Sequence, residues 1–354
     1  NRAEAFAPGR VELLGNHTDY NEGVVLGAAI DRGVKVTGES RADGGIALQS
    51  AMMGELEISA TNLRPQTAQR WANYPLGVVN ELRAAGFEIE GFSAQIDSDL
   101  PAGSGLSSSA AFEVATAFLL LKLLDREVPR MEIAKLCQRA EHSFVGVQSG
   151  LLDQVCSIFG KKDHAVYFDA RSEEVQTIPF PSNLALIITE SGSRRELTSG
   201  LYNQRRQETR NAADILGVAA LRDASFSMLA MLPPILQRRA AHIVGENERV
   251  ARATDLLGRG DGAGFGALMN ESHESSRTNF ENSTPELDLL VEIARQLTGV
   301  LGARLTGGGF GGATVTLCEA INANSVASEL KHRYEERTQL QSQTFLCRIA
   351  PGAH

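Results

Sequence analysis

Glycines and serines placed before a long apolar run carry the strongest chemical signal in the chain. The segment consists of Gly103, Ser104, Gly105, Leu106, Ser107, Ser108 and Ser109. Glycines let backbone N–H groups approach a ligand closely, and a helix that begins at the serines adds unpaired N–H donors. The pattern predicts a phosphate-binding loop, and a plain helix cap stays the alternative. It is neither a Walker A sequence, which needs a Lys after the last glycine, nor a dinucleotide fingerprint.

A polar loop follows Arg10 and lies between two strand-like runs at residues 11–14 and 24–30. It contains Asn16, His17 and Asp19. Amides and carboxylates that accept hydrogen bonds from neighbouring hydroxyls are a usual means of holding a polyol. The loop therefore indicates a hydroxyl-binding element, and a polar turn is an equally good interpretation. A metal site is a weaker one, because two ligands without a third fall short.

Two carboxylates stand out in the next stretch. Glu141 continues the apolar face of a helix that begins near Pro129, and an inward carboxylate is costly unless it is paired or binds a cation. Asp153 follows Gly146 and Gly150 and lies near the start of another helix. The alternatives are that Glu141 reaches the surface and that Asp153 only favours the helix dipole.

A fourth segment at 307–312 has five glycines in six residues and lies between strand-like runs. So much glycine predicts either a tight hairpin or a close approach to another group.

These segments need a scaffold of helices and strands. An apolar helix at 107–124 should be central and buried, and further helices are expected at 202–216, at 242–257 and from Pro285. Strands are expected at 184–189 and 313–317. The composition changes to Pro, Ser and Asn near 179–183. We therefore predict two domains, at 1–180 and 181–354.

Composition narrows the function classes. The chain has 354 residues, 43% of them hydrophobic and 22% charged, with a net charge of −9. This charge argues against a general affinity for nucleic acid or anionic membrane, and the most apolar run, 110–124, is too short and too charged to cross a bilayer. Four scattered cysteines without a CxxC pair indicate reduced thiols in a cytoplasmic protein. Because the chain begins with Asn1 rather than Met, we expect a preceding segment.

The four segments, in this order, resemble the signatures of the GHMP small-molecule kinases and, among them, of the galactokinases. The matching runs are Gly9-Arg10 with Gly15-Asn16-His17-Thr18-Asp19-Tyr20-Asn21, then Gly103 to Ala111, and Gly307 to Gly312. Further matches are Gly150 to Gln154, the run from Arg195 to Arg206, His242 to Glu246, and Ser283 to Asp288. The resemblance covers nearly the whole chain.

The resemblance implies an α+β fold of two domains, with an N-terminal mixed sheet, a C-terminal ferredoxin-like domain and the active site between them. It implies ATP-dependent phosphorylation of the anomeric hydroxyl of D-galactose, with Mg²⁺. We further expect the protein to be a monomer. Asp153 would be the catalytic base and Arg10 would stabilise charge. Residues from Gly103 to Ser109 would hold ATP, and Ser109 and Glu141 the Mg²⁺. Sugar contacts would come from Asn16, His17, Asp19, Gly150 and Tyr202.

One position departs from the family. Galactokinases usually have Glu where this chain has Asn16, and in the family that Glu contacts the hydroxyl at C6. The departure leaves one alternative beside galactose, a kinase for a modified galactose such as galacturonate or N-acetylgalactosamine. A galactose sensor without turnover is a separate alternative, but such sensors lose residues of the serine loop, and Ser107, Ser108 and Ser109 are all present here. With a neutral Asn16, a carboxylate at C6 should be rejected less strongly.

Overall fold

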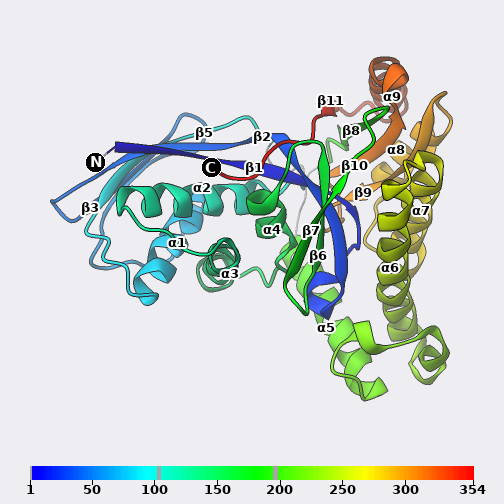
Figure 1. Ribbon diagram of the computed structural model, residues 1–354, viewed down its shortest axis with the longest axis horizontal. Coiled ribbons are helices and arrows are strands. Elements are labelled where there is room, and N and C mark those ends of the chain that lie inside the picture. Colours follow the sequence, from blue (N-terminus) through cyan, green and yellow to red (C-terminus); the bar gives the residue numbers. More distant parts are fainter. Residues whose placement is uncertain (1, 102–104, 194–197) are drawn as a thin grey trace.

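The computed structural model describes residues 2–101, 105–193 and 198–354, which fold around two β-sheets (Figure 1). The larger sheet has seven strands in the order β4-β3-β5-β2-β6-β7, with β1 paired to β2. The β3–β5 pair is parallel and its other pairs are antiparallel, so the sheet is mixed. Its strands are β1 (Arg2–Leu14), β2 (Val24–Ser40), β3 (Gly45–Ser50), β4 (Gly54–Ser59), β5 (Phe92–Ser98), β6 (His164–Asp169) and β7 (Glu174–Pro179).

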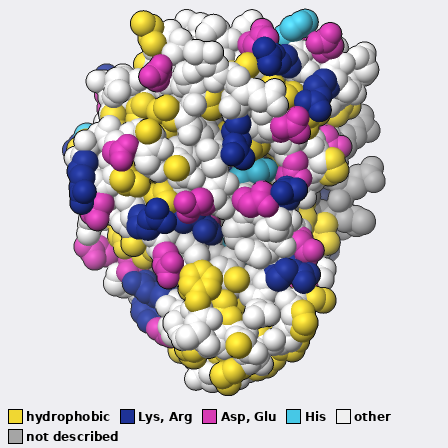
Figure 2. Space-filling model, turned by 90° about the vertical axis from the view of Figure 1, so that its right-hand side faces the viewer, with side chains coloured by type: hydrophobic (Ala, Val, Ile, Leu, Met, Phe, Trp, Pro, Cys, Tyr) yellow, Lys and Arg dark blue, Asp and Glu magenta, His cyan; other side chains and the backbone are white. Residues whose placement is uncertain are grey.

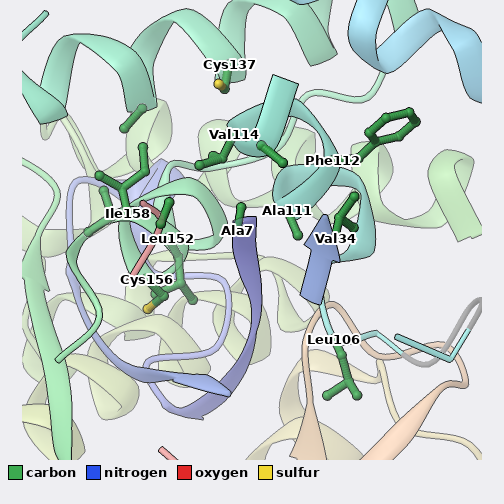
Figure 3. Packing of buried hydrophobic residues seen from close by; sticks show 14 of the residues in the cluster. Ala7, Val34, Leu106, Ala111, Phe112, Val114, Cys137, Leu152, Cys156 and Ile158 are labelled. Carbon is green, nitrogen blue, oxygen red and sulfur yellow. The ribbon is translucent and has the colours of Figure 1, made fainter. Parts of the chain in front are cut away.

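Helices α1 to α4 pack together on one face of this sheet (Figure 1). They are α1 (Asn73–Ala84), α2 (Ser108–Leu123), α3 (Arg130–Ala140) and α4 (Leu152–Phe159). Helix α2 is buried on nearly all sides, as its apolar sequence predicts. Figure 3 shows Ala111 and Val114 of this helix near Ala7 of β1, within one hydrophobic core. The core fixes the start of α2 relative to β1, and both contribute to the site described below.

The second sheet is antiparallel, in the order β11-β8-β10-β9. Helices α7 and α8 pack on β9, and α9 packs beside α8. The strands are β8 (Leu184–Glu190), β9 (Val300–Thr306), β10 (Ala313–Glu319) and β11 (Thr344–Cys347). The helices are α5 (Thr198–Leu216), α6 (Pro234–Gly258), α7 (Gly262–Ser275), α8 (Pro285–Arg295) and α9 (Ala323–Thr338).

The chain passes from the first sheet to the second between Pro179 and Leu184, where the composition changes. It returns at its end, because Phe6 and His354 exchange two backbone hydrogen bonds, of 3.0 and 3.1 Å. Ile349 also forms an isolated β-bridge with Ile30 of β2. The last residues of the chain therefore lie against β1 and β2, and the boundary at 180 stays a prediction.

The surface over the second half mixes charges of both signs, as Figure 2 shows for one face. All four cysteines are buried and unpaired. Within the described residues, no helix is long and apolar enough to cross a membrane.

Candidate active site

One cavity collects residues from all four chemistry-bearing segments. It lies where β1, the start of α2, the turn before α4 and the β9–β10 turn meet. Its lining includes Arg10, Glu12, Asn16, His17, Asp19, Gly105, Ser107, Ser108, Ser109, Glu141, Ser149, Gly150, Asp153, Tyr202, Gly308, Gly309 and Phe310. Of the predicted ATP-binding residues, Gly103 and Ser104 lie outside the described residues, as does Arg195. Leu106 is a buried core residue and is not part of this lining.

The pair formed by Arg10 and Asp153 lies at the centre of this site. Arg10 Nε and Nη2 both lie 2.8 Å from Asp153 Oδ1, and Arg10 Nη1 donates to the carbonyl of Gly105 at 2.7 Å. The Arg10 side chain is 5% exposed, whereas that of Asp153 is 28% exposed. Because both contacts from Arg10 end on Oδ1, the other carboxylate oxygen of Asp153 can accept a proton from a ligand in the cavity.

The serine loop is attached to β1 and leaves hydrogen-bonding groups free at the start of α2. Arg10 N donates to the carbonyl of Leu106 at 3.0 Å, so Leu106 anchors the loop. Ser107 precedes α2 with a φ of 58°, yet its side chain makes no capping hydrogen bond. Its buried Oγ has no partner within the described residues. An unpaired hydroxyl beside the unpaired N–H groups of a helix start is suited to bind phosphate oxygens.

The glycine segment at 307–312 is both a hairpin turn and a wall of the cavity. Strands β9 and β10 pair directly on either side of it, with Ala313 opposite Thr306. A Cβ atom on Gly307, whose φ is +75°, would lie 2.7 Å from the carbonyl of Gly105. Glycine is therefore required where the turn meets the serine loop.

Asp19 and Gly150 form a second close approach. Asp19 accepts hydrogen bonds from the backbone N–H groups of Leu152, at 3.2 Å, and Tyr20, at 3.0 Å. A Cβ atom on Gly150 would lie 1.7 Å from Asp19 Oδ2. Burial raises the pKa of Asp19, and the nearby charge of Asp153 adds to the rise. Gly150 therefore makes room for the Asp19 carboxylate.

His17 is buried beside two tyrosines. Its Nδ1 lies 2.7 Å from Tyr20 Oη and its Nε2 lies 3.0 Å from the carbonyl of Gly308. Because a carbonyl can only accept, these partners assign the proton to Nε2. Burial lowers the pKa of His17 to about 4, so the imidazole is neutral near pH 7. The ring also lies 5.0 Å from that of Tyr202, whose pKa burial raises well above 10.

Asn16 is fully buried, and its amide has protein partners on every side. Its Nδ2 donates to Glu12 Oε1 and to the carbonyl of Gly307, both at 2.8 Å. Its Oδ1 accepts from Asn282 Nδ2 at 2.8 Å. Arg304, also fully buried, donates to the same Glu12 Oε1 at 3.0 Å. The Asn16 amide therefore connects β1, the glycine turn and the loop before α8.

Buried carboxylates meet on the other side of Asp153. Glu141, 7% exposed, begins a π-helical turn after α3 and accepts hydrogen bonds from the hydroxyls of Ser149 and Ser109. Burial raises the pKa of Glu141 to about 7, and Asp153 adds to the rise. Glu113, in α2, is fully buried, and its Oε1 has no partner within the described residues.

This arrangement fits a divalent cation that is also bound by a nucleotide. Within the described residues, no group of three or more His, Cys, Asp or Glu side chains could hold a metal by itself. Mg²⁺, however, is commonly bound by one or two carboxylates together with phosphate oxygens and water. Glu141 and Ser109 could supply the protein ligands, and a bound cation would favour the ionised form of Glu141, which burial and the charge of Asp153 now disfavour.

Sequence reasoning missed the residues that support the polar loop. Glu246 in α6 is fully buried and accepts from the backbone N–H groups of Gly15, at 2.8 Å, and Asn16, at 2.9 Å. Burial alone would raise its pKa, but Arg249 and other nearby positive charges hold the pKa of Glu246 well below its usual value. Glu12 was missed as well, although a charged residue inside an apolar strand is a recognisable signal.

Comparison with known proteins agrees with this site. The GHMP kinases N terminal domain matches residues 73–161, the GHMP kinases C terminal domain matches 253–336, and the galactokinase galactose-binding signature matches 2–39. The chain is 41% identical to a galactokinase of Roseiflexus sp. over 98% of this chain and 91% of that protein. It is 42% identical to a galactokinase of Homo sapiens over 93% of this chain and 86% of that protein.

A solved structure extends the likeness to three dimensions. The galactokinase of Lactococcus lactis, crystallised in complex with galactose, superposes with a TM-score of 0.96. The two are 33% identical, and the match covers 100% of this chain and 95% of that one. The expected two-domain α+β fold, with one mixed sheet and a second sheet, is confirmed. With these relatives and this site, the chain belongs to the galactokinase family of the GHMP kinases.

Proposed function

We propose that this chain transfers the γ-phosphoryl group of ATP to the anomeric hydroxyl of D-galactose. A bond forms between the sugar O1 and the γ-phosphorus, and the bond from that phosphorus to the β,γ-bridging oxygen breaks. The products are α-D-galactose 1-phosphate, ADP and a proton. The observation that carries the proposal is the Arg10–Asp153 pair, which lies between the serine loop and the polar loop in one cavity.

Asp153 is proposed as the base for the sugar hydroxyl. Its Oδ1 is held by two Arg10 nitrogens at 2.8 Å, which fixes the plane of the carboxylate. The remaining oxygen takes the proton of O1 as the new bond forms. Arg10 lies beside the same place and offsets the negative charge that spreads over the transferred group.

The start of α2 is proposed to hold the triphosphate. Gly105, Ser107, Ser108 and Ser109 line the cavity. The Ser107 hydroxyl, which has no partner within the described residues, and the N–H groups at the helix start would bind phosphate oxygens. Ser109 and Glu141 would hold Mg²⁺, which neutralises phosphate charge and orients the γ-phosphoryl group when bound. The rise in the pKa of Glu141 indicates a place where a cation is favourable.

The sugar would lie against the polar loop, opposite the serines. Asp19 accepts from sugar hydroxyls, and Gly150 leaves the space that its carboxylate occupies. Tyr202 keeps its phenolic proton and can donate. Neutral His17, whose two nitrogens already have protein partners, would position Gly308 at the cavity wall and holds the hydroxyl of Tyr20.

A sugar panel tests this proposal. Purified protein is incubated with MgATP and, separately, with D-galactose, D-glucose, D-galacturonate or N-acetyl-D-galactosamine, while ADP release is followed and the product is assigned by ³¹P NMR. We expect galactose to give the highest kcat/KM and an anomeric phosphate. A higher kcat/KM for either modified sugar would overturn the galactose assignment. Binding of galactose and ATP without ADP release would indicate a sensor rather than a kinase.

A further inference from the structure

The polar groups of the cavity differ in whether they are still free to bind a ligand. Asn16 is not free, because both hydrogens of its amide are donated within the protein, to Glu12 Oε1 and to the carbonyl of Gly307. Its carbonyl oxygen already accepts from Asn282, and its side chain is sealed from solvent. A substrate hydroxyl could reach this amide only by displacing one of these partners.

The neighbouring Glu12 has one carboxylate oxygen, Oε2, that accepts no hydrogen bond from the described residues. Both hydrogen bonds to its carboxylate, from Asn16 Nδ2 and Arg304 Nη2, end on Oε1. Glu12 lines the cavity and 6% of its side chain is exposed. Glu113 Oε1 is buried and has no hydrogen-bond partner within the described residues, whereas Glu12 Oε2 is not among such atoms.

We propose that Glu12 Oε2 accepts a hydrogen bond from the substrate and that Asn16 only positions the Glu12 carboxylate. The inference rests on the proposed function, because it takes the substrate to be a hexose. Two donors on Oε1 fix the carboxylate, so that Oε2 is presented to the cavity before the sugar arrives. Such preorganisation makes a polar contact selective, since a ligand without the matching hydroxyl leaves a buried carboxylate oxygen unpaired.

The place of Glu12 on β1 indicates which end of the sugar it contacts. Residues two apart in a strand point to the same face and are separated by about 6.7 Å. Arg10 and Glu12 are related in this way, and both line the cavity. With the reacting hydroxyl at Arg10 and Asp153, Glu12 lies about one hexose ring away. Its partner is therefore a hydroxyl remote from C1, at C4 or C6.

A contact from Glu12 alters the specificity expected at C6 of the sugar. The neutral Asn16 suggests that a carboxylate at C6 would meet no negative charge. The Glu12 carboxylate, however, lies 2.8 Å from the Asn16 amide and faces the same cavity. The acceptor is thus supplied from a different position on the backbone, and a sugar with a carboxylate at C6 should be disfavoured by the Glu12 charge.

The test compares D-galactose with 4-deoxy-D-galactose and 6-deoxy-D-galactose in the parent protein and in Glu12→Gln. In the variant, the donors Asn16 and Arg304 hold the amide oxygen, so that an NH₂ group replaces Oε2 at the cavity. We expect the parent to prefer galactose over one of the deoxy sugars by at least about tenfold in kcat/KM. In Glu12→Gln this preference should fall to about threefold or less, because galactose loses its hydrogen bond to Oε2, which the deoxy sugar never made.

Two further variants separate substrate reading from structural support. Glu12→Asp keeps a negative charge for Arg304 but withdraws the carboxylate from the cavity, so it should reduce the same preference even if Glu12→Gln does not fold. Thr306→Val removes a hydroxyl that bonds the backbone N and O of Glu12, at 2.9 and 3.1 Å, and leaves the carboxylate in place. It should lower stability and keep the parent's preference.

The inference is overturned if the folded Glu12 variants keep the parent's preferences for both deoxy sugars, or if Thr306→Val removes those preferences equally. The dissociation constants of the same three sugars are measured by calorimetry without ATP. If galactose binds but is not phosphorylated, the proposed function fails, while the comparison of dissociation constants still tests Glu12. If galactose does not bind at all, the inference fails with the proposed function.

Discussion

Replacing Glu141 by Gln should change how both stability and the Mg²⁺ requirement depend on pH. Glu141 is 7% exposed, and burial raises its pKa to about 7 from an ordinary value of 4.5. The folded, metal-free protein therefore holds a proton on Glu141 at pH values at which the unfolded chain has lost it. Gln keeps the shape and hydrogen-bonding capacity of the protonated acid but cannot ionise.

The size of the effect follows from the pKa difference. About 2.5 pH units at 1.36 kcal/mol each give about 3 kcal/mol of unfolding free energy. Because the folded pKa is the higher one, this stability is fully present below about pH 4.5 and is lost as pH rises through about 7. Relative to Glu141→Gln, the metal-free parent should therefore lose about 3 kcal/mol between pH 4.5 and pH 8.

In the presence of Mg²⁺, the ionised Glu141 of the parent should be an advantage over the neutral Gln of the variant. A cation bound by the ionised carboxylate favours the charged form, so the parent's affinity for Mg²⁺ in the presence of nucleotide should increase as pH rises through 7. Glu141→Gln should need at least about tenfold more Mg²⁺ for half activity, with little dependence on pH. Urea unfolding at a series of pH values and Mg²⁺ titrations of ADP release measure the two effects.

Two outcomes would refute this reasoning. Equal pH profiles of urea unfolding for parent and variant would mean that Glu141 does not titrate with a raised pKa. A variant that is less stable by about 1–3 kcal/mol at every pH, with an unchanged Mg²⁺ requirement, would identify Glu141 as a structural carboxylate.

Further predictions concern the close approach at Gly150 and the free hydroxyl of Ser107. Gly150→Ala would place a Cβ 1.7 Å from Asp19 Oδ2. In calorimetric titrations, galactose affinity should therefore fall by at least about tenfold, while ATP binding persists. Gly258→Ala is the matched control, because a Cβ there meets nothing within 4 Å. Ser107→Ala should raise the KM for ATP by about tenfold with little loss of stability, because this hydroxyl makes no capping bond. Thr284→Ala should do the opposite, losing about 1 kcal/mol of stability without a change in KM, because Thr284 does cap its helix. Equal effects of the last two variants on KM would contradict the role of Ser107.

The regular elements could be predicted from the sequence where pattern and length agreed. The apolar run at 107–124 forms α2 at Ser108–Leu123, and Thr284 caps a helix that begins at Pro285, as expected. The strand expected at 184–189 is β8, Leu184–Glu190. In each case the hydrophobic period and the flanking residues point the same way. The glycine segment was left between a hairpin and a close approach, and it is both.

The connections between distant segments could not be predicted. Glu246 bonds the backbone of the polar loop across more than two hundred residues, and Arg304 reaches Glu12 from β9. Such pairs depend on how the two sheets meet, which no local pattern encodes. The sequence also predicts a sugar contact for Asn16, because it does not show that partners from three other segments occupy the Asn16 amide.

The contacts assigned to Asn16, His17, Asp19, Gly150 and Tyr202 stay predictions, as do the monomeric state, the cytoplasmic location and the domain boundary at 180. Gly103 and Ser104 belong to the predicted ATP loop and lie outside the described residues. Each is open to direct measurement.

The role of Asp153 is the central claim, and one variant tests it most directly. Asp153→Asn is nearly isosteric, and its amide oxygen can still accept from Arg10, so the cavity should keep its shape. It cannot take the proton of the sugar hydroxyl. With saturating galactose and MgATP, kcat for ADP release should fall by about 10²–10⁴, while the dissociation constant of galactose stays within about tenfold. A variant that keeps more than about a tenth of the parent's kcat would contradict the assignment of Asp153 as the base.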